Sequence, residues 1–145
     1  MTAPPYGGGL YIADTSAWNH ATRASVVDDW SRAFADGQIA TCAPAVLELL
    51  FSAQDAEELN RIDGGLAALR DIPVTRSTNR AAIGAMRALA RIRPRYHRVS
   101  GLDLLTAAAA SEACIGVLHY DRHFDRLAEV LLFESRWIAP PGSLP

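Results

Sequence analysis

"LYIADTSAW" at residues 10–18 is the stretch that decides the fold, because an apolar run stops there abruptly at an acid. Residues 10–13 have the composition of a buried strand, and Asp14 follows them with two hydroxyl side chains directly behind it. Aspartate is favoured as the N-cap of a helix, so Asp14 could simply begin one. It could equally be one ligand of a metal site, and the residues alone leave both interpretations open.

Short apolar segments alternate with helical patterns along the rest of the chain. We predict strands at 10–13, 38–42, 71–75 and 115–120, with a last one near 131–133 or 137–138. Helices are predicted at 25–37, 44–53, 55–70 with a break at Gly64–Gly65, 77–93 with Ser77 or Thr78 as its cap, 102–114, and 121–130. This alternation predicts a parallel sheet with helices on both faces. Ligands of such folds bind outside the carboxyl ends of the strands.

Length and composition limit the class of protein. The 145 residues fit one domain, which we expect over residues 10–145 after a flexible leader at 1–9 that is rich in proline and glycine. No run approaches the ~18 apolar residues of a membrane span, and no secretory signal is recognisable, so a cytoplasmic location without membrane contact is expected. Cys42 and Cys114 lie in apolar contexts without metal-ligand spacing, which favours two buried free thiols.

The basic residues are unusual, because all 14 of them are arginine. A Schiff base and a phosphate-binding loop lysine are therefore excluded. Arginine suits bidentate contacts to phosphate, although a compositional bias of the genome would explain the pattern as well. The net charge of -2 argues against broad affinity for nucleic acid.

Glu48 interrupts the apolar helical segment "AVLELLF" at residues 45–51. A buried carboxylate without a partner is costly, so this side chain should be exposed, paired or bound to a cation. No arginine lies three or four positions away on the same helix. Because the helix follows the second strand, Glu48 is expected beside the same edge of the sheet as Asp14.

Two further acids occupy comparable positions. Asp103, in "SGLDLLTAAAA" (residues 100–110), could form a capping box with Ser100, or it could face the carboxyl edge of the sheet from a first helical turn. Asp121 ends the strand in "VLHYDRHF" (residues 117–124) as Asp14 ends the first strand, and again capping competes with a site. Carboxylates gathered at one edge would repel one another. A divalent cation removes this penalty, and oxygen ligands favour Mg²⁺ or Mn²⁺ over zinc, for which no His/Cys cluster exists.

Taken together, four features resemble a known family: "YIADTSAW" (11–18), the lone Glu48, "GLDLLTAAAA" (101–110) and "GVLHYDRHFDRLA" (116–128). The family is that of the PIN domains, specifically the VapC-type toxin ribonucleases of bacterial toxin–antitoxin pairs. The resemblance spans residues 10–138 and includes the order and spacing of the four acids. It implies a PIN-like three-layer α/β/α sandwich with a central, mainly five-stranded parallel sheet. It also implies a Mg²⁺-dependent endoribonuclease that cleaves a structured RNA of the tRNA or rRNA class.

The resemblance assigns the family's catalytic acids to Asp14, Glu48, Asp103 and Asp121, with the hydroxyl of Thr15 or Ser16 beside them. Asp14 and Asp103 would be the principal metal ligands, and Asp121 would be the third. Many relatives carry a further aspartate where this chain has His123, so occupancy of a second metal position stays open. His123 would either contact a phosphate or remain idle and half-exposed.

The resemblance further implies a cognate antitoxin that covers the active site, and either a homodimer or a toxin–antitoxin hetero-oligomer. Apolar residues on the early helices are the candidates for this contact: Trp18, Val26, Val27, Trp30, Phe34, Leu47 and Phe51. Trp18 and Trp30 are favoured because tryptophan is enriched at interfaces. Phe34 and Leu47 are expected to face the core of the domain itself.

Basic residues that could position an RNA backbone cluster before Asp103: Arg87, Arg91, Arg93, Arg95, His97 and Arg98. Arg95 and Arg98, in the loop, are the better placed, whereas Arg87 and Arg91 are expected on a solvated helix face. Two other functions remain open. One is an aspartate-based phosphohydrolase or receiver-like domain, although the acid expected two places after Asp14 and a lysine partner are absent. The other is a catalytically idle PIN-like module that binds metal or RNA without turnover.

Overall fold

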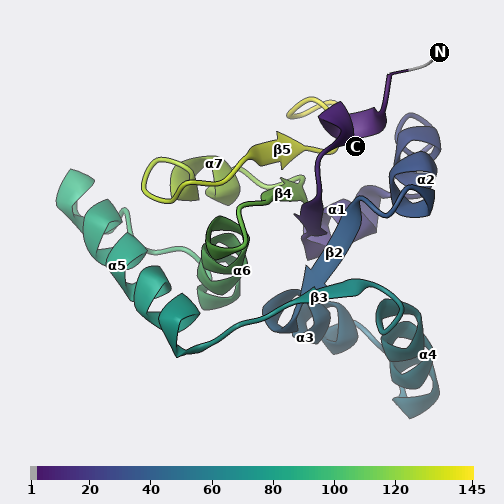
Figure 1. Cartoon of the computed structure of the whole chain (residues 1–145), viewed down its shortest axis with the longest axis horizontal. Helices are drawn as coiled ribbons and strands as arrows, with labels where there is room; N and C mark the ends of the chain where they lie inside the picture. Colours follow the sequence, from purple (N-terminus) through teal and green to yellow (C-terminus); the bar gives the residue numbers. More distant parts are fainter. Residues whose placement is uncertain (1–2) are drawn as a thin grey trace.

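A parallel sheet of five strands runs through residues 3–145, the part of the chain that the computed structural model describes (Figure 1). The strands are β1 (Tyr11–Ala13), β2 (Ile39–Cys42), β3 (Arg70–Ile72), β4 (Gly116–His119) and β5 (Ser135–Trp137). They lie in the order β3-β2-β1-β4-β5, and every neighbouring pair is parallel. The predicted parallel sheet is confirmed, and its last strand lies between the two candidate segments and includes Trp137.

Helices cover both faces of this sheet, as the α/β alternation predicts. They are η1 (Pro5–Gly8), α1 (Thr15–His20), α2 (Val27–Ala35), α3 (Ala43–Phe51), α4 (Ala56–Leu66), α5 (Arg76–Ile92), α6 (Gly101–Glu112) and α7 (His123–Leu127). Alternate strand residues point to opposite faces. Ile12 and Val117 belong to the core cluster that α5 and α6 complete, whereas Tyr11 and Leu118 belong to the cluster completed by α1 and α2. The result is the expected α/β/α sandwich.

Several local predictions were wrong. Helix α4 continues through Gly64–Gly65, where we expected a break, and neither glycine has a positive φ. Helix α5 begins after Thr75, which forms a capping box with Thr78, so Thr78 is the third residue of the helix and not its cap. Helix α1 was not among the predicted helices, although a helix capped by Asp14 was one of the two interpretations left open for that residue. Cys42 is buried as expected, but Cys114 is exposed because the chain turns there with a left-handed φ of 59°.

The segment expected as a leader contributes to the amino end of the sheet. Residues 1–2 of it lie outside the described residues, and Pro5–Gly8 forms η1. The Gln38 side-chain amide donates hydrogen bonds to the carbonyl oxygens of Pro5 and Gly9, at 3.0 and 3.1 Å. These bonds attach η1 to the loop that precedes β2, at the end of the sheet opposite to the acids.

The direction of the strand order reverses between β1 and β4, because β2 and β3 follow β1 on one side and β5 follows β4 on the other. A parallel α/β sheet forms a crevice outside the carboxyl ends of its strands at such a reversal. Gly116 permits this pairing, since a Cβ there would lie 2.6 Å from the Tyr11 ring. Asp14 and Asp121 follow the two strands that flank the reversal. Within residues 3–145, no helix has both the length and the apolarity that crossing a membrane would require.

Candidate metal centre

The two carboxylate oxygens of Asp14 have different environments. Its Oδ2 accepts hydrogen bonds from the backbone N–H and the hydroxyl of Ser16, at 3.0 and 2.6 Å, and so caps α1. Its Oδ1 is buried and has no hydrogen-bond partner among residues 3–145. Burial raises the pKa of this carboxyl, while the bonds from Ser16 oppose the rise. Capping and ligand roles are therefore compatible, since each would use a different oxygen.

The Ser16 hydroxyl connects the two strand ends that flank the crevice. It donates to Asp14 and accepts the backbone N–H of Tyr120, at 2.9 Å. The backbone N–H of Asp14 also donates to the carbonyl of Leu118, at 2.9 Å. Of the two hydroxyls that were considered, Ser16 therefore holds the Asp14 carboxylate beside the turn that leads to Asp121.

Glu48 extends from α3 toward Asp14 and Asp103. Each of the three acids offers an oxygen that lies within 4.8 Å of the others. Pro44, near the start of α3, lacks an N–H at a position where a helix does not need one, so the helix can begin directly after β2. Burial raises the pKa of the Glu48 carboxyl, and the charges of Asp14 and Asp121 add to this effect.

Asp103 lies in the first turn of α6 and is buried, with 6% of its surface exposed. The capping box that could have explained it does not form, because the Ser100 hydroxyl accepts from the N–H of Leu102, at 3.2 Å. Burial raises the pKa of the Asp103 carboxyl to about 8, with further increases from the three neighbouring acids. A shift of this size means that the ionised group lacks a compensating positive charge.

Asp121 follows β4 and forms a second group with Asp103 and His123. Its Oδ1 accepts the backbone N–H of His123, at 2.9 Å, so α7 begins at His123 and not at Asp121 as predicted. The Nδ1 atom of His123 lies 3.4 Å from Asp121 Oδ1 and 3.9 Å from Asp103 Oδ2. The side chain of His123 is 45% exposed, so it is half-exposed as expected but lies against the acids.

The donor atoms of these groups suit a divalent cation. Among the described residues, no arginine forms an ion pair with any of the four acids, and Asp14 Oδ1 is both buried and unsatisfied. Buried carboxylates without such partners are costly. Oxygen ligands match Mg²⁺ or Mn²⁺, while the imidazole of His123 adds a nitrogen to the second group.

One residue of the site was missed in the sequence. His119 is fully buried at the end of β4, and its Nδ1 accepts the backbone N–H of Asp121, at 3.1 Å. Burial lowers the pKa of this imidazole to about 4. The signal was present in "VLHYD", where a histidine interrupts an apolar strand two residues before an acid.

The apolar residues considered for a protein contact are arranged differently from our expectation. Trp30 is only 8% exposed and packs against Trp18 with ring centroids 4.9 Å apart, so it is a core residue. Phe34 and Leu47, which were expected in the core, are 42% and 62% exposed. The error at Phe34 arose because it shares one side of α2 with Trp30, which it contacts, and only packing against neighbouring elements decides which of the two is covered.

Comparison with known proteins agrees with this arrangement. The family model of the PIN domain matches residues 11–130. Ribonuclease VapC18 of Mycobacterium tuberculosis is 38% identical over 136 residues, which are 93% of this chain and 99% of that protein. Ribonuclease VapC51 of the same organism is 34% identical over 134 residues, covering 92% of this chain and 96% of the relative.

Solved structures share the fold. DNA-bound VapBC from Salmonella typhimurium contains a chain that superimposes with a TM-score of 0.70 at 15% identity, covering 90% of this chain and 98% of that one. VapBC-5 from Mycobacterium tuberculosis gives a TM-score of 0.62 at 20% identity, with coverage of 89% and 98%. The acids at the strand ends, the family match and the two similar ribonucleases lead to one conclusion: this chain belongs to the PIN-domain family and is a member of VapC type.

Proposed function

We propose that this chain is the toxin of a type II toxin–antitoxin pair and acts as a Mg²⁺-dependent endoribonuclease, with Mn²⁺ as the alternative metal. Its substrate would be a structured RNA of the tRNA or rRNA class. The observation that carries the proposal is the environment of Asp14, whose buried Oδ1 has no partner within the described residues and whose carboxylate groups with the acids Glu48 and Asp103. The names of the similar proteins, ribonucleases VapC18 and VapC51, support the reaction class.

Each acid has a distinct part in the proposed chemistry. Asp14 Oδ1 and the Asp103 carboxylate would hold the ion, with Asp121 as the third ligand. A divalent ion bound there supplies Lewis-acid stabilisation of the charge that develops on a phosphodiester during hydrolysis. Glu48 is less buried than Asp14 and Asp103, so its carboxylate is the group that we assign to accept a proton from the attacking water.

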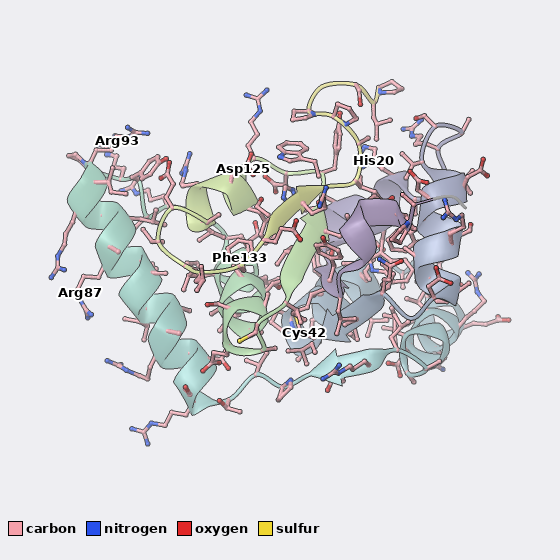
Figure 2. All side chains as sticks on the ribbon, turned by 45° about the horizontal axis from the view of Figure 1, so that its top comes forward. His20, Cys42, Arg87, Arg93, Asp125 and Phe133 are labelled. Atoms are coloured by element: carbon pink, nitrogen blue, oxygen red, sulfur yellow. The ribbon has the colours of Figure 1, made fainter. Side chains whose placement is uncertain are left out.

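Arginines beyond the acids would bind the RNA backbone. Helices α5 and α6 pack together, and the Ser77 hydroxyl contacts Glu112 at 2.5 Å, so the start of α5 lies level with the end of α6. Because α5 has 17 residues and α6 has 12, with Asp103 as the third residue of α6, the end of α5 extends nearly two turns, roughly 9 Å, past the level of Asp103. Arg95 and Arg98 follow in the exposed loop. Figure 2 shows Arg87 on the outer side of α5 and Arg93 beyond the end of that helix, where its guanidinium lies over the Tyr96 ring, 3.9 Å from the ring centroid.

An apolar groove would receive the antitoxin. This groove has a volume of about 400 Å³ and lies between α1, α2, α3 and α4, with Trp18, Phe34, Leu49, Ile62 and Leu66 among its lining residues. Phe51, at the end of α3, is 91% exposed. Exposed apolar patches of this kind are typical of protein contacts. An antitoxin as the partner is supported by the similar solved structures, which are VapBC structures, VapBC-5 being a member of a family of toxin–antitoxin systems.

Cleavage of RNA by the purified chain tests the proposal. Wild type, Asp14→Asn and Asp63→Asn would each be incubated with total RNA in Mg²⁺, in Mn²⁺ and in chelator. Asp63 is an exposed acid on α4 and serves as the matched control. We expect discrete fragments from wild type and Asp63→Asn with metal only, and none from Asp14→Asn. Equal cleavage by Asp14→Asn would contradict the proposal, while metal binding without cleavage by wild type would favour the idle module.

A further inference from the structure

His119 has no contact with solvent, and all of its polar atoms are paired. The imidazole stacks on Phe124, with ring centroids 5.0 Å apart, and meets the edge of Trp137 at the same distance. Its Nδ1 lies 3.1 Å from the backbone nitrogen of Asp121, and its Nε2 lies 2.7 Å from the hydroxyl of Ser135. The imidazole thus packs against two aromatic rings and is hydrogen-bonded at both nitrogens.

The directions of these hydrogen bonds can be assigned from their chemistry. A backbone N–H only donates, so Nδ1 of His119 must be the acceptor and cannot carry a proton. The proton of the neutral imidazole is therefore on Nε2, which donates to the Ser135 hydroxyl. That hydroxyl donates its own proton to Asp125 Oδ1, at 2.7 Å. One consistent chain of donors runs from the backbone of Asp121 to the carboxylate of Asp125.

The chain of hydrogen bonds ends on a carboxylate that is itself fixed. The indole N–H of Trp137 donates to Asp125 Oδ2, at 3.0 Å, so the two oxygens of Asp125 are occupied from β5. Figure 2 shows Asp125 beside α7 and β5, above the end of the sheet. The turn after β4 is thereby tied to β5 through side chains, in addition to the backbone hydrogen bonds that pair the two strands.

From this geometry we propose that His119 is a positioning residue for Asp121, which it holds through the backbone N–H in the orientation that metal binding needs. The inference rests on the proposed metal site. Within residues 3–145, the Asp121 carboxylate accepts one hydrogen bond, from the His123 N–H, and its Oδ1 lies 3.4 Å from the His123 Nδ1. Its side chain is 34% exposed, compared with 8% for Asp103, so packing restrains it less. The motion of the Asp121 side chain is therefore limited mainly by how firmly the backbone of its turn is held.

A purely structural role for His119 predicts something different. If the imidazole only fills space between Phe124 and Trp137, an apolar side chain of similar size would replace it without affecting the acids. If it positions Asp121, loss of the acceptor at Nδ1 frees the turn and weakens metal binding. Residues that orient metal ligands without touching the metal contribute about 10- to 100-fold in affinity.

Three variants of the full chain separate these roles, with the affinity for Mn²⁺ measured by calorimetry in the absence of RNA. His119→Leu removes the acceptor and the donor, and we expect Mn²⁺ binding to weaken at least tenfold. His119→Asn places an amide oxygen where Nδ1 was, so affinity should stay within about threefold of wild type. Phe124→Leu disturbs the same packing without touching the hydrogen bonds, so it should lower the melting temperature but leave Mn²⁺ affinity unchanged. Unchanged affinity in folded His119→Leu would overturn the proposal.

Nuclear magnetic resonance at pH 7 supplies a readout that needs neither metal nor activity. Imidazole nitrogen shifts should place the His119 proton on Nε2, and the Asp121 amide should exchange slowly with solvent in wild type and in His119→Asn. In Ser135→Ala the tautomer should persist, because the Asp121 N–H still requires an acceptor. A proton on Nδ1, or rapid exchange of the Asp121 amide in wild type, would overturn the proposal even if His119→Leu does not fold. Wild type that binds Mn²⁺ but cleaves no RNA would contradict the proposed function alone.

Discussion

Two groups of side chains share Asp103, and they differ in burial and in chemistry. Asp14, Glu48 and Asp103 form a group that offers only oxygens, drawn from the end of β1 and from two helices, and two of its three members are buried. The other group joins Asp103 to Asp121 and His123, which lie two residues apart in one turn and are partly exposed. The first group is fixed by the fold, whereas the second depends on a single turn.

This difference indicates that the two groups have different roles in metal binding. A buried group of acids is costly without a cation and is therefore the place where an ion gains most. A more exposed group that includes an imidazole is less costly to keep without a cation, and its choice of metal is more easily altered. We therefore expect the first group to determine whether a metal binds, and the second to determine which metal and how tightly.

Removing the shared residue should have the largest effect. Asp103→Asn takes one oxygen charge from both groups, so kcat/KM for RNA should fall by at least ~1000-fold, as expected when metal stabilisation of several kcal/mol is lost. Cleavage of a labelled RNA measures this loss, with Asp63→Asn as the control that should behave as wild type. Activity above a tenth of wild type in Asp103→Asn would show that the two groups do not act through this acid.

The cost of the buried group should appear as a dependence of stability on pH. The pKa of Asp103 rises from 3.8 to about 8 in the folded, metal-free chain. Between these values the folded state binds the proton more tightly than the unfolded state, so the free energy of unfolding falls as pH rises from about 4 to about 8. In chelator, the melting temperature of wild type should therefore fall by several degrees between pH 5.5 and pH 8.5.

Asp103→Asn is the matched variant for this measurement, because its amide stays neutral at every pH. Its melting temperature should fall less over the same range and exceed that of wild type at pH 8.5. Added Mg²⁺ should raise the wild-type value at pH 8.5 and leave the variant nearly unchanged. A wild-type melting temperature that rises with pH in chelator would contradict the uncompensated charge that we assign to Asp103.

Changing the second group should have the smallest effect. His123→Asp replaces the nitrogen with a carboxylate, which favours Mg²⁺. Activity in Mg²⁺ should rise by a few-fold relative to activity in Mn²⁺, and the fold should be unaffected because the His123 backbone N–H still donates to Asp121. Arg122→Ala, at the neighbouring exposed position, is the control. A large loss of activity in both metals would mean that the imidazole has a direct role in the reaction.

The sequence alone predicted the order of the strands and of most helices. Apolar periodicity is a local property, so it can be recognised in one segment without knowing which segments pack against it. The sequence also predicted that acids would follow β1 and β4 and begin α6, since parallel strands bring their carboxyl ends to one edge. The sequence could not decide whether Asp14 is a helix cap or a metal ligand, because the two roles use different oxygens of the same carboxylate. It erred at Gly64–Gly65, where the low helix propensity of glycine predicted a break. Helix α4 instead continues through both glycines to Leu66, which is buried.

What only the tertiary structure decided is which groups lack partners. The sequence cannot show that Ser100 bonds to Leu102 and leaves Asp103 free, that Trp30 is covered while Phe34 is exposed, or that His119 joins the turn after β4 to β5. Each of these depends on contacts between segments, on hydrogen-bond direction or on burial. A pattern of residue types places a carboxylate at the edge of a sheet, but its protonation and its need for a cation follow from the atoms that surround it in space.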